Sequence, residues 1–280
     1  MRSLIAFLTD YGTRDGFVAV CHGILARAAP DARVLDVSHD VPPQDVRHGA
    51  AVLARVARHL PSAIYVAVVD PGVGTSRRGV ALVAGTSLLL GPDNGLLVPA
   101  AEVLGGVRQA YALTNVALWR PDVDPTFHGR DVFAPVAGHL ASGGSVARVG
   151  EALPPEELVR LPVPRCDLTD DALTAEVTYL DRFGNVQLAG GPAELAAVGA
   201  LGAGGEVGAG VGGEVEVRVG EVSDRAQVGR TFSDVAEGEL VVYLDSDGRL
   251  ALAVNCGDAS VRLNAKAGDL VRLTSPEPPA

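Results

Sequence analysis

Lysine is almost absent from this chain, and its absence removes two classes of function. The 23 basic residues include a single lysine, Lys266, so the lysine-dependent phosphate loop is excluded and only Lys266 could form a Schiff base. Acidic residues number 34, which gives a formal net charge of -11. A broad nucleic-acid interface needs a basic face, so we expect no nucleic-acid partner.

Cysteines and long apolar segments are also scarce. Cys21, Cys166 and Cys256 are far apart and odd in number, which predicts buried or partly buried free thiols. No apolar run approaches the roughly 20 residues of a membrane-spanning helix, so no membrane partner is expected. The first 12 residues lack the features of a signal peptide and favour a β-strand, which predicts a cytoplasmic protein.

What the sequence does contain is an alternation of strand and helix patterns over residues 1–149. Helical spacing over 17–28 and 45–60 separates apolar segments with strand character. The segment 63–69 is apolar throughout, as is typical of a central strand in a parallel sheet. These patterns predict an α/β domain with a mostly parallel sheet between helices.

The sequence pattern changes after residue 149. Residues 150–165 carry four prolines without a clear period and are predicted to be a linker. Strand patterns dominate residues 166–280, which predicts an all-β domain resembling a small barrel. Within it, the glycine-rich segment 199–213 predicts a flexible loop.

Polar residues gather where the predicted strands of the first domain end. Asp10 and Asp70 each follow an apolar strand and precede glycines, and ligands in open α/β sheets bind beyond such strand ends. His128 lies in the turn "FHGRD". A helix cap or turn remains the alternative interpretation for each carboxylate. A metal site could be drawn from Asp10, Asp70 and His128, but no metal-ligand spacing supports it, and we predict none.

The stretch "VVDPGVGTSRRG" contains Asp70 and the adjacent arginines Arg77 and Arg78. It matches neither the dinucleotide-binding glycine pattern nor the phosphate loop. In the second domain, "YLDRFGNVQL" places Asp181, Phe183 and Asn185 around a turn. A hairpin accounts for part of this pattern, but an aromatic face can also stack on a nucleobase and asparagine can bond adenine.

Seven motifs in order extend these observations over nearly the whole chain. They are "LTDYGTRDGFVAVCHGIL", "DVSHDVPPQDV", "VVDPGVGTSRR", "GPDNGLL", "TFHGRDVFAP", "LDRFGNVQL" and "YLDSDGRLALAVNCGDA". In these motifs the chain resembles the S-adenosyl-L-methionine (SAM) hydrolases, also called SAM hydroxide adenosyltransferases, whose halogenating relatives are fluorinase and chlorinase. The resemblance implies attack of water on the 5′ carbon of SAM, which yields adenosine and L-methionine. It also implies an α/β domain with a β-barrel domain, no metal or cofactor, and a homotrimer with substrate between subunits.

The resemblance also implies the site residues. The family's catalytic Asp-Arg-His set corresponds to Asp70, Arg77 and His128. Its substrate-binding positions, for ribose, nucleoside and methionine, correspond to Asp10, Asp181, Phe183, Asn185 and Ser246. The chain departs from the relatives at Asp247, where fluorinase has an arginine, and at Leu188-Ala189, where Thr-Asn is common.

Three alternatives remain open at this point. A SAM-dependent halogenase of the same fold would have tyrosine at Asp70 and Tyr-Ser at His128-Gly129, so the residues present favour hydrolysis. A metal-dependent hydrolase could use the strand-end Asp and His residues. A non-catalytic adenosine- or SAM-binding module could keep the same constellation without turnover.

Overall fold

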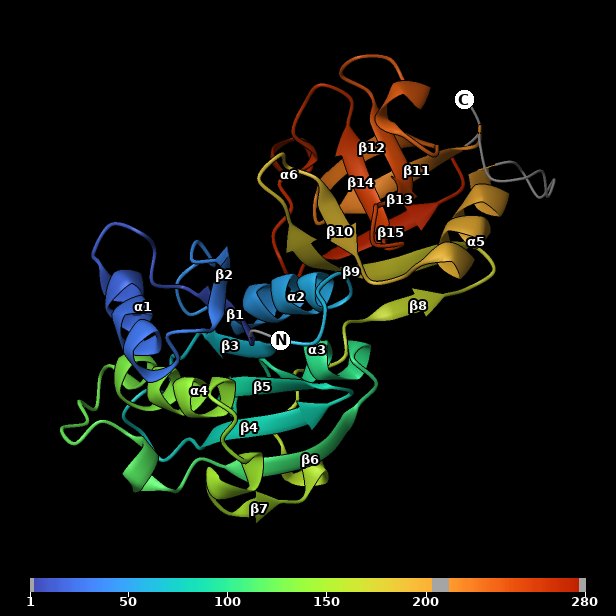
Figure 1. The fold of residues 1–280 in the computed structure, drawn as a ribbon. Coiled ribbons are helices and arrows are strands. Elements are labelled where there is room, and N and C mark those ends of the chain that lie inside the picture. The colour runs from blue at the N-terminus through green and yellow to red at the C-terminus, as the bar shows by residue number, and fades with distance from the viewer. Residues whose placement is uncertain (1–2, 203–211, 277–280) are drawn as a thin grey trace. The chain divides into compact units, whose positions relative to one another are not determined.

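A computed structural model describes residues 3–202 and 212–276 and divides the chain into two compact units, Met1–Leu161 and Pro162–Ala280 (Figure 1). The glycine-rich loop predicted over 199–213 therefore lies largely outside the described residues, and the prediction is wrong for residues 199–202, which end the helix Pro192–Gly202. Among the residues described, none of the helices combines the length and apolar character that a bilayer crossing requires.

The first unit is built on a sheet with the strand order β2-β1-β3-β5-β4-β6-β7. The strands are β1 (Leu4–Thr9), β2 (Arg33–Ser38), β3 (Ile64–Val68), β4 (Gly79–Ala84), β5 (Ser87–Pro92), β6 (Val107–Ala112) and β7 (Ala152–Leu153). The half containing β2, β1, β3 and β5 is parallel, as predicted, and the pairings of β4, β6 and β7 are antiparallel. Two residues join β4 to β5, too few for the crossover that a parallel pair needs.

Helices cover both faces of this sheet, which confirms the predicted α/β layering (Figure 1). They are α1 (Phe17–Ala28), α2 (Val46–Ala57), α3 (Val98–Val103) and α4 (Ala134–Ala141), which continues the π-helical turn η2 (Gly129–Phe133). On one face, Cys21 and Leu25 of α1 and Val136 of α4 pack against Phe7 and Val66. Residues of α2 and α3 pack on the opposite face, because successive strand side chains point to opposite sides.

The segment predicted as a linker, 150–165, is tied to the first unit through Leu161. Strand β7 pairs with β6, and Leu158 is buried in the core. The Asp93 carboxylate accepts a hydrogen bond from the Val159 amide at 2.9 Å. Short 3-10 turns η1 (Val116–Leu118), η3 (Val146–Arg148) and η4 (Pro155–Glu157) complete this unit.

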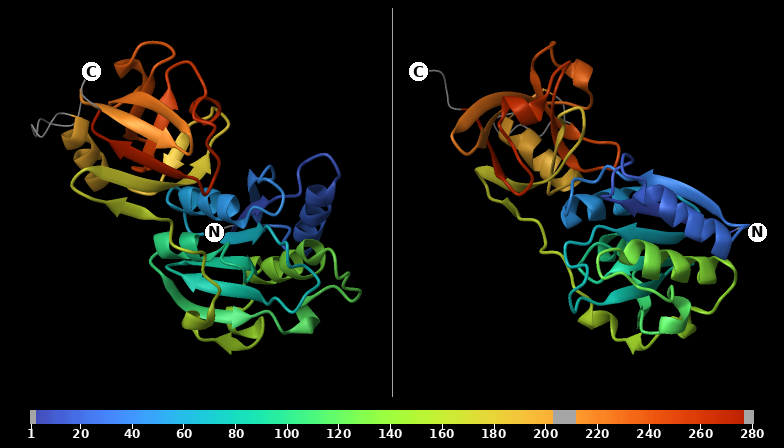
Figure 2. Two further views of the ribbon diagram at one scale, coloured as in Figure 1. Left: turned by 180° about the vertical axis from the view of Figure 1, so that it is seen from behind. Right: turned by 90° about the vertical axis from the view of Figure 1, so that its left-hand side faces the viewer.

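The second unit is the predicted barrel, closed by the pairing of β9 with β10 (Figure 2). Its strands are β8 (Cys166–Leu168), β9 (Ala172–Leu180), β10 (Val186–Leu188), β11 (Glu214–Val219), β12 (Val222–Val228), β13 (Leu240–Leu244), β14 (Leu250–Val254) and β15 (Leu270–Thr274). Strand β8 pairs with β9 only and lies outside the closed ring.

The barrel also carries helical elements that the all-β description omits: α5 (Pro192–Gly202), α6 (Ala259–Arg262) and the 3-10 turn η5 (Phe232–Asp234). Helix α5 begins at a proline, and its Glu194 carboxylate accepts the Gly191 amide at 2.7 Å. Val198 of α5 is buried in the barrel core. An alanine- and glycine-rich segment gives little periodic signal, so packing rather than pattern defines this helix.

All three cysteines are free thiols. Cys21 is buried and Cys166 is half-buried, as predicted. The prediction is wrong for Cys256, which is exposed in a turn after β14 with a positive φ of 57°.

Candidate functional site

Asp70, Arg77 and His128 meet beyond the carboxyl end of the parallel strand β3. The Arg77 Nε donates to both carboxylate oxygens of Asp70, at 2.8 and 3.0 Å, and Arg77 Nη2 donates to Oδ2. The same Nη2 lies 3.1 Å from His128 Nδ1. One guanidinium therefore joins a carboxylate from one loop to an imidazole from another.

This contact fixes the state of the imidazole. A guanidinium has donors and no acceptor, so His128 Nδ1 must accept and cannot carry a proton while the contact lasts. Burial and the neighbouring Arg77 charge both lower the pKa of His128 below its ordinary 6.5. His128 is thus neutral at pH 7, with its remaining proton on Nε2.

The two neighbouring arginines have different partners. The side chains of Asp70 and Arg77 are only 6% and 12% exposed, and the Arg77 guanidinium lies 5.5 Å from the centre of the Phe133 ring. Arg78 instead bonds the Asp93 carboxylate at 2.7 Å and the Glu157 carbonyl at 2.8 Å. The structure therefore assigns Arg77, not Arg78, to the Asp70 and His128 group.

Gly74 brings the loops bearing Asp70 and His128 together. Its φ is +78°, and a Cβ at this position would lie 2.8 Å from the carbonyl oxygen of Pro125. A glycine at such a position can let a ligand approach the backbone. At Gly74 the close approach is instead made by the loop that leads to His128.

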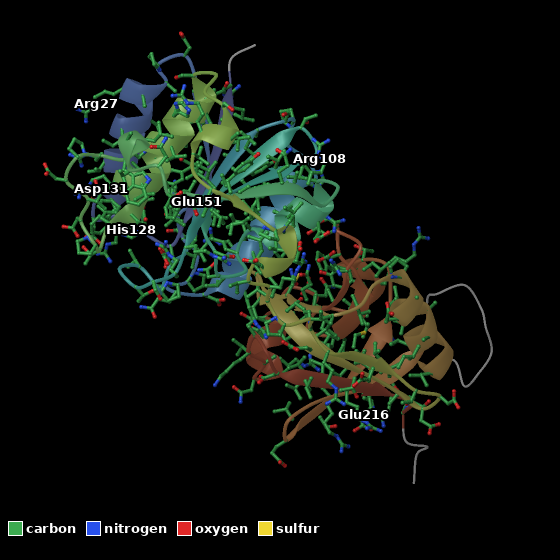
Figure 3. The ribbon with its side chains drawn as sticks, turned by 90° about the horizontal axis from the view of Figure 1, so that it is seen from below. Arg27, Arg108, His128, Asp131, Glu151 and Glu216 are labelled. Atoms are coloured by element: carbon green, nitrogen blue, oxygen red, sulfur yellow. The ribbon has the colours of Figure 1, made fainter. Side chains whose placement is uncertain are left out.

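Asp131 anchors the segment around His128, and the sequence analysis gave it no role (Figure 3). Its fully buried carboxylate accepts from Arg120 Nη1 at 3.1 Å, Arg130 Nε at 2.7 Å and the Asp124 amide at 2.9 Å. These bonds fold residues 120–131 around one carboxylate. No motif marks such a role, because the partners come together only in the folded loop.

Asp10 leaves the sheet beside Asp70, because β1 and β3 are parallel neighbours with Thr9 opposite Val68. Its Oδ2 accepts the Gln44 amide at 2.8 Å, and Gln44 has a φ of 67°. The strand-end argument therefore places both carboxylates at the same edge of the sheet.

Tyr11, a second residue that sequence reasoning missed, directly follows Asp10 after the end of β1. Burial raises the pKa of its phenol well above 10.0, and Cys21, Asp10 and Asp70 raise it further. Its ring packs against Phe127 with centroids 5.6 Å apart. A Cβ at Gly129 would lie 2.1 Å from the Tyr11 hydroxyl oxygen, so this tyrosine fills the space next to His128. An aromatic directly after Asp10, in a chain with 4% aromatics, was the available signal.

In the second unit, Asp181 organises the turn that carries Phe183 and Asn185. Its Oδ1 accepts the Phe183 and Asn185 amides, both at 2.9 Å, and its Oδ2 accepts from Asn185 Nδ2 at 2.7 Å. Phe183 is 72% exposed. The turn holds an aromatic face outward, while the side chains of Asp181 and Asn185 bond each other.

Ser246 lies in a different turn, between β13 and β14, and is exposed. Strand β10 is antiparallel to β14, so the Phe183 and Ser246 turns lie at opposite ends of β10. Tyr243 lies in β13, and burial together with the charges of Asp245 and Asp181 raises its pKa to about 12. The structure thus does not bring Ser246 directly against Phe183.

Asp10, Asp70 and His128 do not form a metal-binding group. Within residues 3–202 and 212–276, the one group with suitable ligand spacing is His22, Asp36 and His39. The Arg77 cation bonds both Asp70 and His128, and its charge would repel a metal ion there.

Comparisons with known proteins identify the same family in both units of the chain. Residues 5–150 match the SAM hydroxide adenosyltransferase N-terminal domain and residues 175–272 match the C-terminal domain of the same family. An (R)-S-adenosyl-L-methionine hydrolase of Salinispora tropica is 53% identical over 97% of each chain. A fluorinase of an Actinoplanes species is 29% identical over 97% of each chain. A crystal structure of an uncharacterized conserved protein from Thermotoga maritima has a TM-score of 0.84 at 36% identity and covers 96% of this chain and 99% of its own.

Proposed function

Because the chain belongs to the SAM hydroxide adenosyltransferase family, we propose that it hydrolyses S-adenosyl-L-methionine to adenosine and L-methionine. The observation that carries the proposal is the buried Asp70–Arg77 pair with His128 on the same guanidinium. The fluorinase relative is more distant than the hydrolase relative, at 29% against 53% identity.

The chemical problem in this reaction lies with the nucleophile. The sulfonium leaves as a neutral thioether, so the leaving group needs no general acid. Water, with a pKa of about 15.7, must be held in line behind the 5′ carbon and lose a proton. The water oxygen bonds to the 5′ carbon as the bond from carbon to sulfur breaks and its electron pair stays on sulfur. Positioning can contribute about 7–11 kcal/mol and a general base about 10²- to 10⁴-fold.

The bonding pattern supports a division of roles within the catalytic group. His128 Nδ1 accepts a hydrogen bond from Arg77, so its Nε2–H group is available to donate a hydrogen bond to the water oxygen and orient the water. The carboxylate of Asp70 retains lone pairs beyond those used by Arg77 and takes the water proton in our proposal. Arg77 keeps the carboxylate in place and balances its charge until the proton arrives.

The halogenating alternative conflicts with the space around His128. Fluorinase has serine where this chain has Gly129, and a Cβ there would lie 2.1 Å from the Tyr11 hydroxyl and 3.0 Å from its Cζ. Tyr11 is packed against Phe17 and Phe127 and cannot move aside without disturbing both rings. Gly129 and Tyr11 together therefore favour a site that excludes the serine of a halide pocket.

Substitution of Gly129 by alanine should lower kcat/KM for SAM by about 100-fold, the effect of an ångström-scale displacement at a reacting centre. The added Cβ would lie 2.1 Å from the Tyr11 hydroxyl oxygen, so Tyr11 or the His128 segment must be displaced. The second substitution Tyr11→Phe removes the hydroxyl and should restore part of the loss in the double variant. Steady-state kinetics of the two single variants and the double variant test this, and an unimpaired Gly129→Ala enzyme would contradict it.

Asp10 is proposed to bind the ribose through its 2′ and 3′ hydroxyls, as acidic residues do at other nucleoside sites. Wild-type enzyme should then prefer SAM to its 2′-deoxy analogue, and Asp10→Ala should reduce that preference to near unity. The ratio of kcat/KM for the two substrates is the measurement. Asp15→Asn, an exposed carboxylate in the same loop, is the matched control and should keep the wild-type ratio.

The remaining roles follow the family resemblance. We propose that Phe183 and Asn185, held by Asp181, bind the adenine, and that Ser246 binds the methionine end. We also propose a cytoplasmic homotrimer in which substrate lies between subunits, so that two chains contribute to each site. Light scattering of the purified protein tests the trimer.

Chromatography of purified protein with SAM tests the function directly. Adenosine and methionine in equal amounts, unchanged by EDTA and by chloride, are the expected products. A halogenated nucleoside would identify a halogenase, and activity lost with EDTA would identify a metal-dependent hydrolase. Bound but unconverted substrate would identify a binding module.

A further inference from the structure

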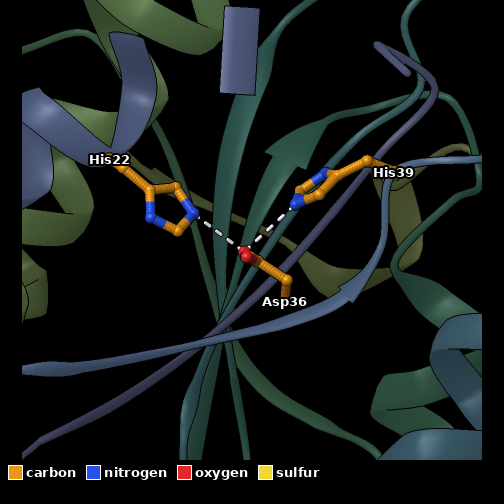
Figure 4. Close-up of side chains that lie close together, drawn as sticks. All are labelled: His22, Asp36 and His39. Atoms are coloured by element: carbon orange, nitrogen blue, oxygen red, sulfur yellow. Dashed lines mark hydrogen bonds and ion pairs between the residues drawn. The ribbon is translucent and has the colours of Figure 1, made fainter. Parts of the chain in front are cut away.

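His22, Asp36 and His39 form a second polar cluster at the edge of the sheet, on the edge strand β2 (Figure 4). His22 projects from α1, Asp36 from β2, and His39 follows the end of β2. The Asp36 Oδ1 lies 2.8 Å from His22 Nε2 and 3.1 Å from His39 Nε2. The three residues each offer one atom that could bind a metal ion, and these three atoms lie within 4.8 Å of one another.

The Nε2 atom of His39 is the unusual member of this cluster. His39 is 6% exposed, and its Nε2 makes no hydrogen bond of acceptable geometry with any described residue, although it points toward Asp36 and His22. Its other nitrogen, Nδ1, lies 2.8 Å from the Thr9 hydroxyl. This buried imidazole nitrogen has an ion-pair contact with Asp36 Oδ1 at 3.1 Å, and the ligand atoms of all three residues lie close enough together to bind one metal ion.

We propose that this cluster is a binding site for a divalent transition-metal ion, with Zn²⁺ as the representative ion. Two imidazole nitrogens and one carboxylate oxygen form a set that zinc accepts in four-coordinate sites with one open position. The Thr9 hydroxyl can accept a hydrogen bond from Nδ1–H of His39, which leaves the lone pair of Nε2 for the metal. Asp36 is 45% exposed, which leaves a path for the ion and for a water ligand.

The surroundings hold the ligands in place before metal arrives. The buried Phe7 ring lies 5.0 Å from the His39 ring and 6.0 Å from the His22 ring, measured between centroids. Its apolar surface supports both imidazoles from one side and shields the site from water. The exposed carboxylate then lies on the solvent side.

Metal at this cluster would cross-link the helix α1 to the strand β2 and its end. The His39 carbonyl accepts the Gly12 amide at 2.8 Å, and Thr9 directly precedes Asp10. Bound metal would therefore stabilise the loop that carries Asp10 without reaching Asp70 or Arg77.

Metal-free protein should be titrated with Zn²⁺ by calorimetry and with Co²⁺ by visible absorption. We expect one saturable site per chain, a rise of several degrees in Tm with Zn²⁺, and Co²⁺ bands typical of low coordination number. His22→Gln and Asp36→Asn should each weaken binding by more than about 100-fold, since even outer-shell partners of a metal cost about 10- to 100-fold. Neither residue is part of the proposed reaction, so both variants should hydrolyse SAM normally.

Matched controls are His59→Gln and Asp40→Asn, both at exposed positions outside the cluster. They should bind Zn²⁺ as tightly as the unaltered protein. No saturable binding, or binding that His22→Gln and Asp36→Asn leave unchanged, would overturn the proposal. Because the readout is metal binding and Tm, the outcome is independent of whether the protein hydrolyses SAM.

Discussion

Replacing Asp70 by asparagine is expected to reduce kcat for SAM hydrolysis by about 10²- to 10⁴-fold, the usual contribution of a general base. The amide has nearly the shape of the carboxylate but cannot accept the proton of the attacking water. Substrate affinity should change little, because Asp70 is proposed to act on the water rather than on SAM. Single-turnover kinetics together with equilibrium binding of SAM separate these two quantities.

Asp70→Asn also breaks the buried ion pair with Arg77, which by itself lowers the stability of the fold. Asp93→Asn is the matched control, because Asp93 is a buried carboxylate that bonds the neighbouring Arg78 and lies outside the proposed chemistry. Asp93→Asn should lower stability while largely preserving kcat. If Asp70→Asn instead weakened SAM binding and left kcat unchanged, the assignment of Asp70 as the base would be wrong.

The sequence predicted those parts of the fold and site that depend on local pattern. Parallel strands put their carboxyl ends at one edge of a sheet, so the strand pattern alone predicts that Asp10 and Asp70 lie at the same edge. The βα rhythm likewise predicted the helices α1 and α2. These features need only the period of apolar residues and the direction of the chain.

Features that depend on distant contacts could not be predicted in this way. The carboxylate of Asp131 is buried by arginines whose orientation is set by the fold, and Arg120 lies 11 residues away in sequence. The Tyr11 hydroxyl occupies the space that a side chain at residue 129 would fill, so its position depends on the glycine there. Local pattern alone does not distinguish Arg77 from Arg78, and only the family resemblance pointed to Arg77. In the structure Arg78 is bound by Asp93 and the Glu157 carbonyl instead.

Replacing Asp131 by alanine should destabilise the protein by about 2–4 kcal/mol. Removal of one partner from a buried ion pair costs about 3–5 kcal/mol, and partial solvent access of Arg120 and Arg130 reduces that figure. The amide of Asp124 also loses its acceptor. Urea denaturation measures the change, and Asp122→Asn, an exposed carboxylate in the same segment, should leave stability unaltered.

The pH dependence of this effect has a definite sign. Burial raises the pKa of Asp131, but hydrogen bonds from Arg130 and the Asp124 amide outweigh it, so the folded-state pKa lies below 3.8. The ionised carboxylate therefore stabilises the fold above pH 3.8, and that contribution is lost as pH falls through the lower, folded-state pKa. The stability difference between wild type and Asp131→Ala should be constant from pH 5 to 7 and shrink below about pH 4. A difference that grew on acidification would mean that Asp131 is protonated in the folded protein and that its bonds to the arginines do not hold the His128 segment.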